Sequence, residues 1–329
     1  MGRIVNGAAI TGPPAQLKQS RSLVIRSAGE HMSATLAAVL PPSSGRQRFA
    51  PLSAFNTLGY AGPFTLRDTA QVETLRRFIE GHRDPGILGR ILSKARLIGD
   101  RRLQQVDGHL AFRPLYDFAV QPQLLGDVEA ILGPDILLWK GRIIVRQPGS
   151  SGQDWHVDFD NKMVGGVHIT FAIAPMTSDN GALQLIPGTH RYEVSLHESQ
   201  RNGACDLRDA ASMLALADAT HPENAPHELV TMELEPGEYF LTKGGLWHGV
   251  PPNHTVSPRP AVLSRYMAPD VESHIWSHDD SAPVVMSKRS LPCILVRGED
   301  SFRLNRLHAP PRPVAGMDPN HRNAARRAV

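Results

Sequence analysis

From residue 136 onward, the chain consists of short β-rich segments separated by Gly, Pro, Asn and Asp. These segments are "ILLWKGRIIVR", "VGGVHITFAIAP", "GALQLIP", "HELVTMELEPGEYFLTKG" and "PAVLSRYMA". Two segments with helical periodicity, "RDTAQVETLRRFIEGH" and "QPQLLGDVEAILGP", come earlier. Helices followed by a run of strands predict an α+β, mainly β chain, with an antiparallel sandwich or barrel in its second half.

The 329 residues are a normal length for one all-β enzyme domain with insertions. We expect a mobile extension over 1–54, a domain over 55–305 and a basic, Pro- and Arg-rich tail over 306–329. The β-rich core of that domain should span 136–270. Residues 191–228 are polar and rich in His, Asp and Glu, which predicts an insertion over the sheet, with a helix in "LRDAASMLALADA" and contacts to substrate.

Two interpretations of the N-terminal segment remain open. The first 50 residues contain Lys, Arg and Ser but only one acidic residue, Glu30. They fit a mobile extension, with Met32 as an alternative start, and they also fit an organellar transit segment.

Composition excludes several classes of function. Hydrophobic residues make up 41% and charged residues 20% of the chain, and the formal net charge is +3. This mild excess gives no indication of a nucleic-acid partner. No apolar run approaches the roughly 20 residues that cross a bilayer. Cys205 and Cys293 lie outside any CxxC pattern, which is typical of free thiols in a reducing compartment and predicts a cytoplasmic location.

The pattern His-x-Asp indicates a candidate metal site only where other residues support it. It occurs at His82–Asp84, His156–Asp158 and His278–Asp280. We interpret the first and last pairs as surface residues, because neither lies near other candidate ligands. Residues i and i+2 of a strand point to the same face, so His156 and Asp158 can both reach one metal ion.

A third ligand and a carboxylate-binding arginine follow later in the chain. His248, in "GGLWHGVPPN", comes after a strand and a Gly-Gly turn, and can return toward the pair. Two histidines and one carboxylate on one face of Fe(II) leave three coordination positions open. Arg259 begins the strand "RPAVLSRYM" and could bind a carboxylate bidentately. Arg265, on the same face of that strand, is the second candidate for this role.

The chain resembles the phytanoyl-CoA dioxygenase family of Fe(II)/2-oxoglutarate oxygenases. The matching segments are "WHVDF", "DNGALQLIPGTHR", "PGEYFLTKGGLWHG" and "PPN", with Arg259 at the expected distance beyond the histidine. They span about residues 140–267, and "LGYAGPFTL" extends the resemblance to about residue 55. Each segment alone is a weak signal, but their common order and spacing are specific.

The resemblance implies a double-stranded β-helix, or jelly roll, with flanking helices. It implies that His156, Asp158 and His248 bind Fe(II), that Arg259 binds the far carboxylate of 2-oxoglutarate, and that Thr170 lies against this co-substrate. Related halogenases have a small residue in place of the carboxylate ligand. Asp158 therefore favours oxygenation.

Other residues near these motifs have less specific interpretations. Arg142 and Arg146 share a face of "RIIVR" and could bind the co-substrate or an anionic substrate, although we prefer a solvated strand face. Trp155 and Trp247 should pack around the metal. We interpret His168 as a hydrogen-bonded core residue.

The expected activity is hydroxylation of an unactivated C–H bond in a small-molecule or carrier-bound substrate, with O₂ as the oxidant and with succinate and CO₂ as products. An Ala-, Arg- and Pro-rich composition is compatible with secondary metabolism in a high-GC bacterium. Two alternatives remain: a cupin-like metal enzyme that does not use 2-oxoglutarate, and a non-catalytic binding member of the fold.

Overall fold

The structure, a computed structural model, describes residues 49–81, 108–158, 166–277 and 287–312. The expected mobile extension lies almost wholly outside the described residues. So do the pairs His82–Asp84 and His278–Asp280, and most of the expected C-terminal tail. Within the described part of the chain, no helix combines the length and the apolar character that crossing a membrane requires.

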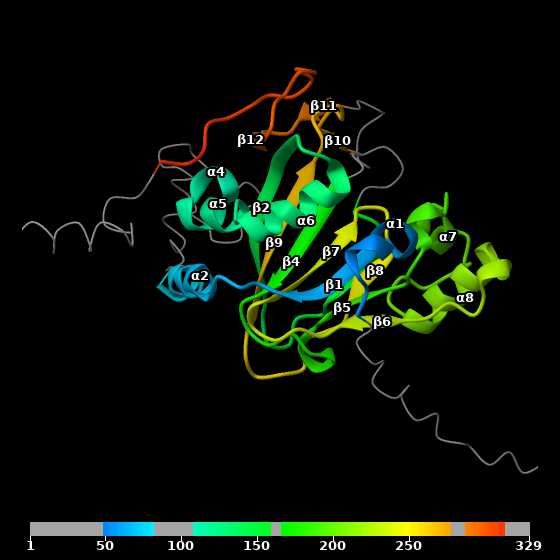
Figure 1. Cartoon of the computed structure of the whole chain (residues 1–329). Coiled ribbons are helices and arrows are strands. Elements are labelled where there is room, and N and C mark those ends of the chain that lie inside the picture. The colour runs from blue at the N-terminus through cyan, green and yellow to red at the C-terminus, as the bar shows by residue number, and fades with distance from the viewer. Residues whose placement is uncertain (1–48, 82–107, 159–165, 278–286, 313–329) are drawn as a thin grey trace, which may run out of the picture. The chain divides into compact units, whose positions relative to one another are not determined.

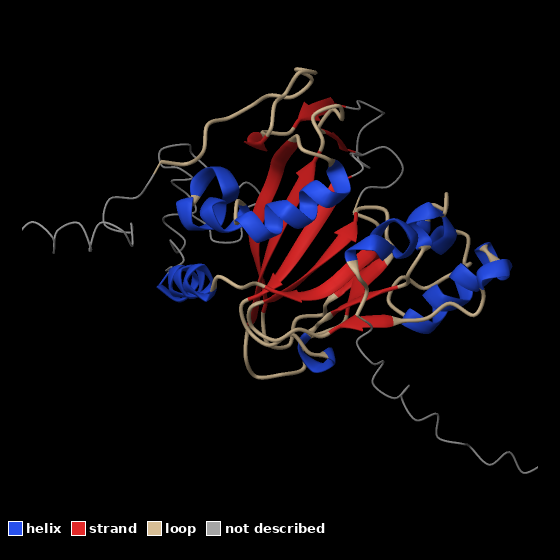
Figure 2. Ribbon diagram, in the orientation of Figure 1, coloured by secondary structure: helices blue, strands red, loops and turns tan. Residues whose placement is uncertain are grey.

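Two antiparallel sheets form the body of the domain (Figures 1 and 2). The major sheet has the order β1 (Tyr60–Thr65), β7 (Glu238–Lys243), β4 (Gly166–Ala172), β9 (Arg259–Met267), β2 (Ile136–Arg146), β12 (Ile294–Arg297). The minor sheet has the order β3 (Gln153–His156), β8 (His248–Val250), β5 (Leu183–Leu185), β6 (Val230–Met232). A hairpin of β10 (His274–Ser277) and β11 (Ser287–Ser290) is separate. The expected α+β, mainly β jelly-roll fold is confirmed.

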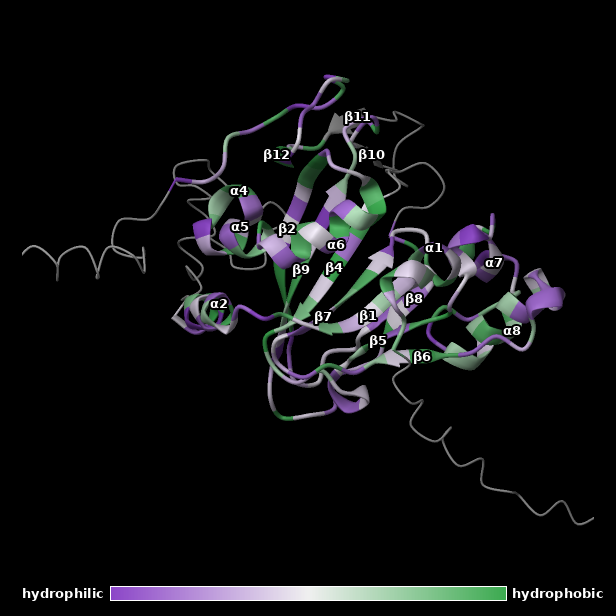
Figure 3. Cartoon of the chain, viewed as in Figure 1, coloured by the Kyte–Doolittle hydropathy of each residue, from purple (hydrophilic) through white to green (hydrophobic). Residues whose placement is uncertain are grey.

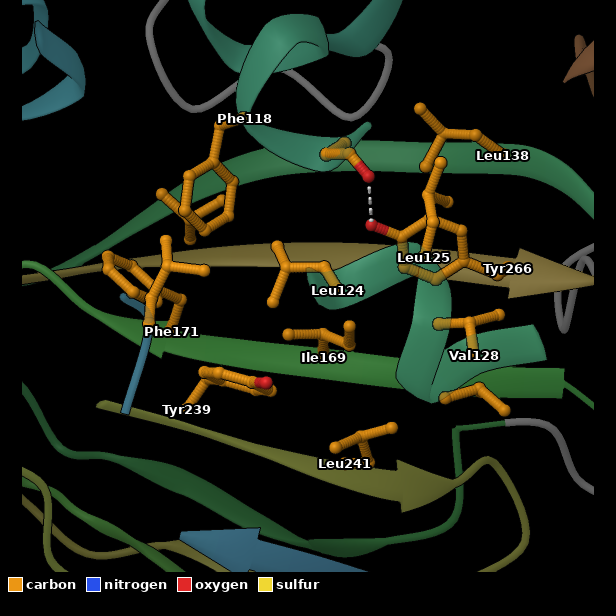
Figure 4. Close-up of a cluster of buried hydrophobic side chains, with 14 of the residues drawn as sticks. Phe118, Leu124, Leu125, Val128, Leu138, Ile169, Phe171, Tyr239, Leu241 and Tyr266 are labelled. Carbon is orange, nitrogen blue, oxygen red and sulfur yellow. Dashed lines mark hydrogen bonds between the residues drawn. The ribbon is translucent and has the colours of Figure 1, made fainter. Parts of the chain in front are cut away.

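Helices cover the outer face of the major sheet. They are α2 (Thr69–Gly81), α4 (Gly108–Ala111), α5 (Arg113–Ala119) and α6 (Pro122–Leu132). Figure 4 shows Phe118, Leu124 and Val128 from this layer packed on Ile169, Phe171, Tyr239, Leu241 and Tyr266 from the strands. The Tyr266 hydroxyl donates to the Ala119 carbonyl at 2.7 Å. Both helices expected from periodicity are present, as α2 and α6, and the Asp68 side chain accepts hydrogen bonds from the first-turn amides of Ala70 and Gln71.

The inner face of the major sheet packs on the minor sheet. Tyr60, Phe240 and Ala261 contact a cluster that includes Leu185 and Met232. Two short helical segments, η1 (Leu52–Ala54) and α1 (Phe55–Leu58), precede β1. Three others lie between strands: η2 (Ser178–Asn180), η3 (Thr189–Arg191) and η4 (Pro222–Asn224).

The expected insertion forms α7 (Leu196–Arg201) and α8 (Ala210–Thr220). Met213 and Leu196 from these helices share a buried cluster with Trp155 and Trp247. The two tryptophans were expected to pack around the metal, but they pack on the insertion and join it to the minor sheet, and neither lines the cavity described below. Figure 3 shows apolar residues on α8 where it approaches this sheet.

A β-bulge divides β2 into two parts, and residues of the same parity point to opposite faces of the sheet in the two parts. Leu138 pairs with Tyr266, but Lys140 already pairs with Arg265, so β2 has one extra residue at this point. Before the bulge Leu138 packs in the helix-covered core, whereas beyond it Ile143 does so. The bulge therefore turns the even-numbered residues beyond it toward the inner face.

Order extends slightly beyond the expected domain limits. Ala50 exchanges two backbone hydrogen bonds with Gly62 and is buried. The Cys293 amide donates to the Arg306 carbonyl, and the His308 amide donates to the Cys293 carbonyl. Residues on both sides of the expected domain bounds 55–305 thus take part in backbone hydrogen bonds.

His109 should make folding sensitive to acid. Its Nδ1 accepts a hydrogen bond from the Gly141 amide at 3.1 Å, and burial lowers its pKa to about 4, with His308 and Lys140 adding repulsion and the Pro292 carbonyl opposing it. The unfolded chain binds this proton near pH 6.5, so the free energy of unfolding has its full value above that pH. About 3 kcal/mol should be lost as the pH falls to 4.

Urea unfolding at pH 7.5 and pH 4.5 measures this loss. His109→Asn retains an acceptor but does not titrate, so its unfolding free energy should depend less steeply on pH than that of the wild type. Equal slopes for the two proteins would contradict the assignment.

Candidate metal centre

Two histidines face each other from neighbouring strands of the minor sheet. His156 ends β3 and pairs in register with His248, the first residue of β8, and their ring centroids are 4.3 Å apart. Nδ1 of His156 lies 2.8 Å from the Asp154 carbonyl, and Nδ1 of His248 lies 2.8 Å from the Leu246 carbonyl. Each ring therefore donates its Nδ1 proton to a carbonyl two residues earlier, which makes Nε2 the nitrogen that can bind a metal. At His156 this nitrogen accepts a hydrogen bond from the Gln153 side chain at 2.9 Å, which a bound metal would replace.

Asp158 completes the group from the segment after β3. One ligand atom each from His156, Asp158 and His248 lies within 4.8 Å of the others. The Asp158 carboxylate is held by two neighbours: Arg265 donates to Oδ1, and Nδ1 of His168 lies 2.9 Å from Oδ2. The carboxylate is thus oriented before any metal binds.

Electrostatics keep these groups in their metal-binding protonation states. Burial lowers the pKa of His156 to about 4, and repulsion from His248 adds to this. Burial alone would raise the pKa of Asp158, but Arg265 and His168 hold it well below its usual value. Burial and Arg265 lower the pKa of His168 to about 4. At neutral pH His168 is therefore neutral and donates to the carboxylate.

These donors fit a divalent transition metal, and Fe(II) in particular. Two neutral imidazole nitrogens and one carboxylate oxygen are the donor set of the facial triad of non-haem iron oxygenases, which leaves coordination positions open. The carbonyl-anchored imidazoles and the doubly held carboxylate are the outer contacts that such ligands require.

Arg259 lies buried beside this group, with only 4% of its surface exposed. Its Nη2 donates to the Gly181 carbonyl at 2.6 Å and its Nε to the Asn180 carbonyl at 3.3 Å. Burial, with added repulsion from Arg146, lowers its pKa to about 10, so it stays charged at neutral pH. Gly181 has φ +86°, and a Cβ there would lie 2.9 Å from the Pro251 carbonyl oxygen. The backbone conformation at this position and its close contact with Pro251 therefore require glycine.

One cavity of about 380 Å³ connects the candidate residues. His156, Asp158, His248, Arg259 and Thr170 all line it. Thr170 lies on β4 opposite Leu263 of β9. The structure thus brings all five sequence-predicted site residues together.

The positions and contacts of three arginines differ from those expected from the sequence. Arg142 and Arg146, for which a solvated strand face was preferred, line the cavity, because the bulge turns them to the inner face of a sheet covered on both sides. Arg265, the second candidate for binding a co-substrate carboxylate, instead contacts Asp158.

The insertion also differs from expectation. Strand β2 contributes Lys140, Arg142 and Arg146 to the cavity, but none of the described lining residues comes from 191–228, where contacts to substrate were expected. Residues of the insertion instead border a separate cavity of about 400 Å³, together with Phe49 and Tyr60.

Sequence reasoning missed three contributing residues. His168 contacts Asp158, as described above. Gln153 places its Nε2 2.9 Å from Nε2 of His156. Buried Asn253, in the "PPN" motif, donates to the carbonyls of Arg146 and Ser257, which fixes the segment leading to Arg259. Only Asn253 had a signal in the sequence, through its motif.

Removing His168 should weaken metal binding. His168→Leu deletes one of the two groups that hold Asp158, and losing such a contact typically costs about 10- to 100-fold in metal affinity. His168→Asn places an amide nitrogen near the position of Nδ1 and should restore much of that affinity. Competition with a coloured chelator measures it, and equal affinities in wild type and His168→Leu would show that His168 only packs.

Comparison with known proteins places these features in a family context. A sequence model of the family described as phytanoyl-CoA dioxygenase (PhyH) matches residues 55–261. The dioxygenase lolE1 of Epichloe uncinata is 25% identical over 172 residues, which cover 50% of this chain and 60% of that protein. The methylphosphonate hydroxylase of Gimesia maris is 28% identical over 162 residues, covering 49% of this chain and 55% of that protein.

A solved structure supports the fold. CytC3 with Fe(II) and alpha-ketoglutarate is 21% identical and superposes with a TM-score of 0.51 over 79% of this chain and 93% of its own. The likeness extends over almost the whole of that protein, whereas this chain spans little more than half the length of the two curated relatives.

Proposed function

The chain belongs to the phytanoyl-CoA dioxygenase (PhyH) family, and from this membership and the site geometry we propose that it is an Fe(II)/2-oxoglutarate-dependent dioxygenase. It would hydroxylate an unactivated C–H bond of a small-molecule or carrier-bound substrate, with release of succinate and CO₂. The dioxygenase name of lolE1 supports this reaction class, and secondary metabolism is its proposed setting.

One observation carries the proposal: the two imidazoles and the carboxylate converge beside a buried arginine. His156 and His248 direct Nε2 inward because their Nδ1 atoms are hydrogen-bonded to backbone carbonyls. Arg259 uses two donors on carbonyls, and its remaining N–H groups are available to a carboxylate in the same cavity. This geometry supports binding of a dicarboxylate between the metal ligands and Arg259.

The chain's own residues supply orientation and charge. Bound Fe(II) and 2-oxoglutarate would supply the oxidising chemistry, with O₂ as the oxidant. Arg265 and His168 keep Asp158 ionised and fix its direction. Thr170 and Leu263 form the wall against which the co-substrate would lie, and Val250 and Ala261 add apolar surface that limits water.

Anaerobic titration tests this assignment. Fe(II) and 2-oxoglutarate added to the wild type should produce the weak visible charge-transfer band of the metal chelate, and Fe(II) alone should not. Bound iron without this band would indicate a metal enzyme that does not use 2-oxoglutarate. Absence of iron binding would indicate a binding member of the fold.

A further inference from the structure

The cavity contains more positive charge than the proposed reaction uses. Its lining includes five cationic side chains, from Lys140, Arg142, Arg146, Arg259 and Arg265. Among the described lining residues, Asp158 is the only carboxylate. All five cations come from two neighbouring strands, β2 and β9.

The register of these strands places like charges opposite each other. Lys140 pairs with Arg265, and Arg146 pairs with Arg259. Like charges directly opposite in an antiparallel pair destabilise a sheet. Burial and then Arg265 lower the pKa of Arg142, and burial and then Arg142 lower the pKa of Arg146. The crowding therefore opposes folding, and an anion bound between the strands would relieve it.

Three of the five cations already have a role. Arg265 contacts Asp158, and Arg259 faces the co-substrate in the proposed function. The Lys140 ammonium lies 5.9 Å from the centroid of the Trp139 ring. Arg142 and Arg146 remain.

Arg142 and Arg146 line the cavity, and each has one buried N–H group without an acceptor among the described residues. Within the described part of the chain, Arg142 has no ion pair, and its buried Nε has no hydrogen-bond acceptor. Arg146 donates from Nη2 to Gln153 at 2.8 Å, and its Nε is also buried without an acceptor. Nη1 of Arg146 also donates to the Gly152 carbonyl at 3.5 Å. Both side chains are half-buried, so an N–H group without an acceptor is costly at either position.

Gln153 connects this pair of arginines to the metal ligands. Its side-chain oxygen accepts from Arg146, and its side-chain nitrogen lies 2.9 Å from Nε2 of His156. An anion on Arg146 would thus be one side chain away from a metal ligand.

We propose that Arg142 and Arg146 bind the acidic group of the substrate, so that the substrate is a small organic acid whose phosphonate, phosphate or carboxylate fits two guanidinium groups. This rests on the proposed function, because it takes Arg259 to be occupied by 2-oxoglutarate. The cavity of about 380 Å³ must also hold that co-substrate, which favours a small acid.

Calorimetry on the intact chain tests the proposal. The protein is loaded with Fe(II) and 2-oxoglutarate without O₂, and titrated at constant ionic strength with methylphosphonate, acetate and neutral acetamide. The acids should bind, and acetamide should not. Arg142→Gln and Arg146→Gln should each weaken acid binding by roughly tenfold or more, the loss expected for a charge-assisted hydrogen-bond pair. Tighter binding of methylphosphonate or of acetate identifies the acid type.

Two controls separate this effect from charge and folding. Arg297→Gln removes the same charge from β12 of the same sheet, where Arg297 pairs with Glu129 outside the cavity, and acid binding should be unchanged. Arg142→Lys keeps the charge without the planar fork and should bind the acids with intermediate affinity. Circular dichroism shows whether each variant is folded.

Two results would overturn the proposal: acids that bind the wild type no better than acetamide, or an Arg142→Gln variant that loses 2-oxoglutarate affinity instead of acid affinity. Failure of the proposed function gives a different result. In that case the wild type binds iron without the charge-transfer band, and the acid titrations still report on the two arginines.

Discussion

Asp158→Ala should abolish substrate oxidation and lower Fe(II) affinity by two orders of magnitude or more. Losing an outer contact of a ligand costs about 10- to 100-fold, and losing the ligand itself should cost at least as much. The variant also leaves Arg265 and His168 facing each other without the carboxylate that both contact. Any iron that still binds would be held by two imidazoles, with a weaker charge-transfer band.

Succinate release and chelator competition measure these two effects separately. Asp270→Ala is the matched control, since Asp270 is an exposed aspartate just after β9, and both readouts should equal those of the wild type. Unchanged iron affinity in Asp158→Ala would remove Asp158 from the ligand set.

Replacing Arg259 should act on the co-substrate and leave the metal in place. Arg259→Gln removes a charge-assisted, bidentate donor, which is typically worth about 1.5–3 kcal/mol for each hydrogen bond. Two such hydrogen bonds are lost, so we expect the dissociation constant for 2-oxoglutarate to rise by about 100-fold or more. Fe(II) affinity should stay unchanged, because Arg259 contacts the Asn180 and Gly181 carbonyls and none of the three proposed ligands.

Titration of the charge-transfer band gives this constant directly. Arg259→Lys keeps the charge but offers no planar fork, so its constant should fall between those of the wild type and Arg259→Gln. Arg297→Gln serves again as the charge-matched control. An equal constant in wild type and Arg259→Gln would move the carboxylate-binding role to another cation of the cavity.

The proposed metal ligands were accessible from the sequence because local rules determine them. Residues two positions apart on a strand point to the same face, and this made His156 and Asp158 candidate ligands. The pairing of His156 with His248 is non-local, and it was the order of the surrounding motifs that indicated it. The family match confirms the family that this resemblance indicated, and the solved structure agrees with the expected fold.

The residues that surround the ligands could not be predicted from the sequence, because their positions depend on strand register. His168 reaches Asp158 alongside Arg265, its partner across β4 and β9. Neither residue has a local signal for this role. Arg142 and Arg146 face the cavity because of the bulge in β2, and a bulge cannot be located from alternation alone. The helix in the insertion was predicted, but its packing on Trp247 and its distance from the cavity were not.

The alternation of core-facing and cavity-facing side chains along β4 and β9 has a consequence for how the sequence of such a protein can evolve. On β4, Ile169 and Phe171 hold the helix-covered core, while His168 and Thr170 face the cavity. Substitutions on the cavity side can therefore alter what the protein accepts with little effect on its stability. Insertion of one residue would exchange the two sets at once, so variation in specificity should accumulate by replacement in these strands, and changes of length should be confined to the loops.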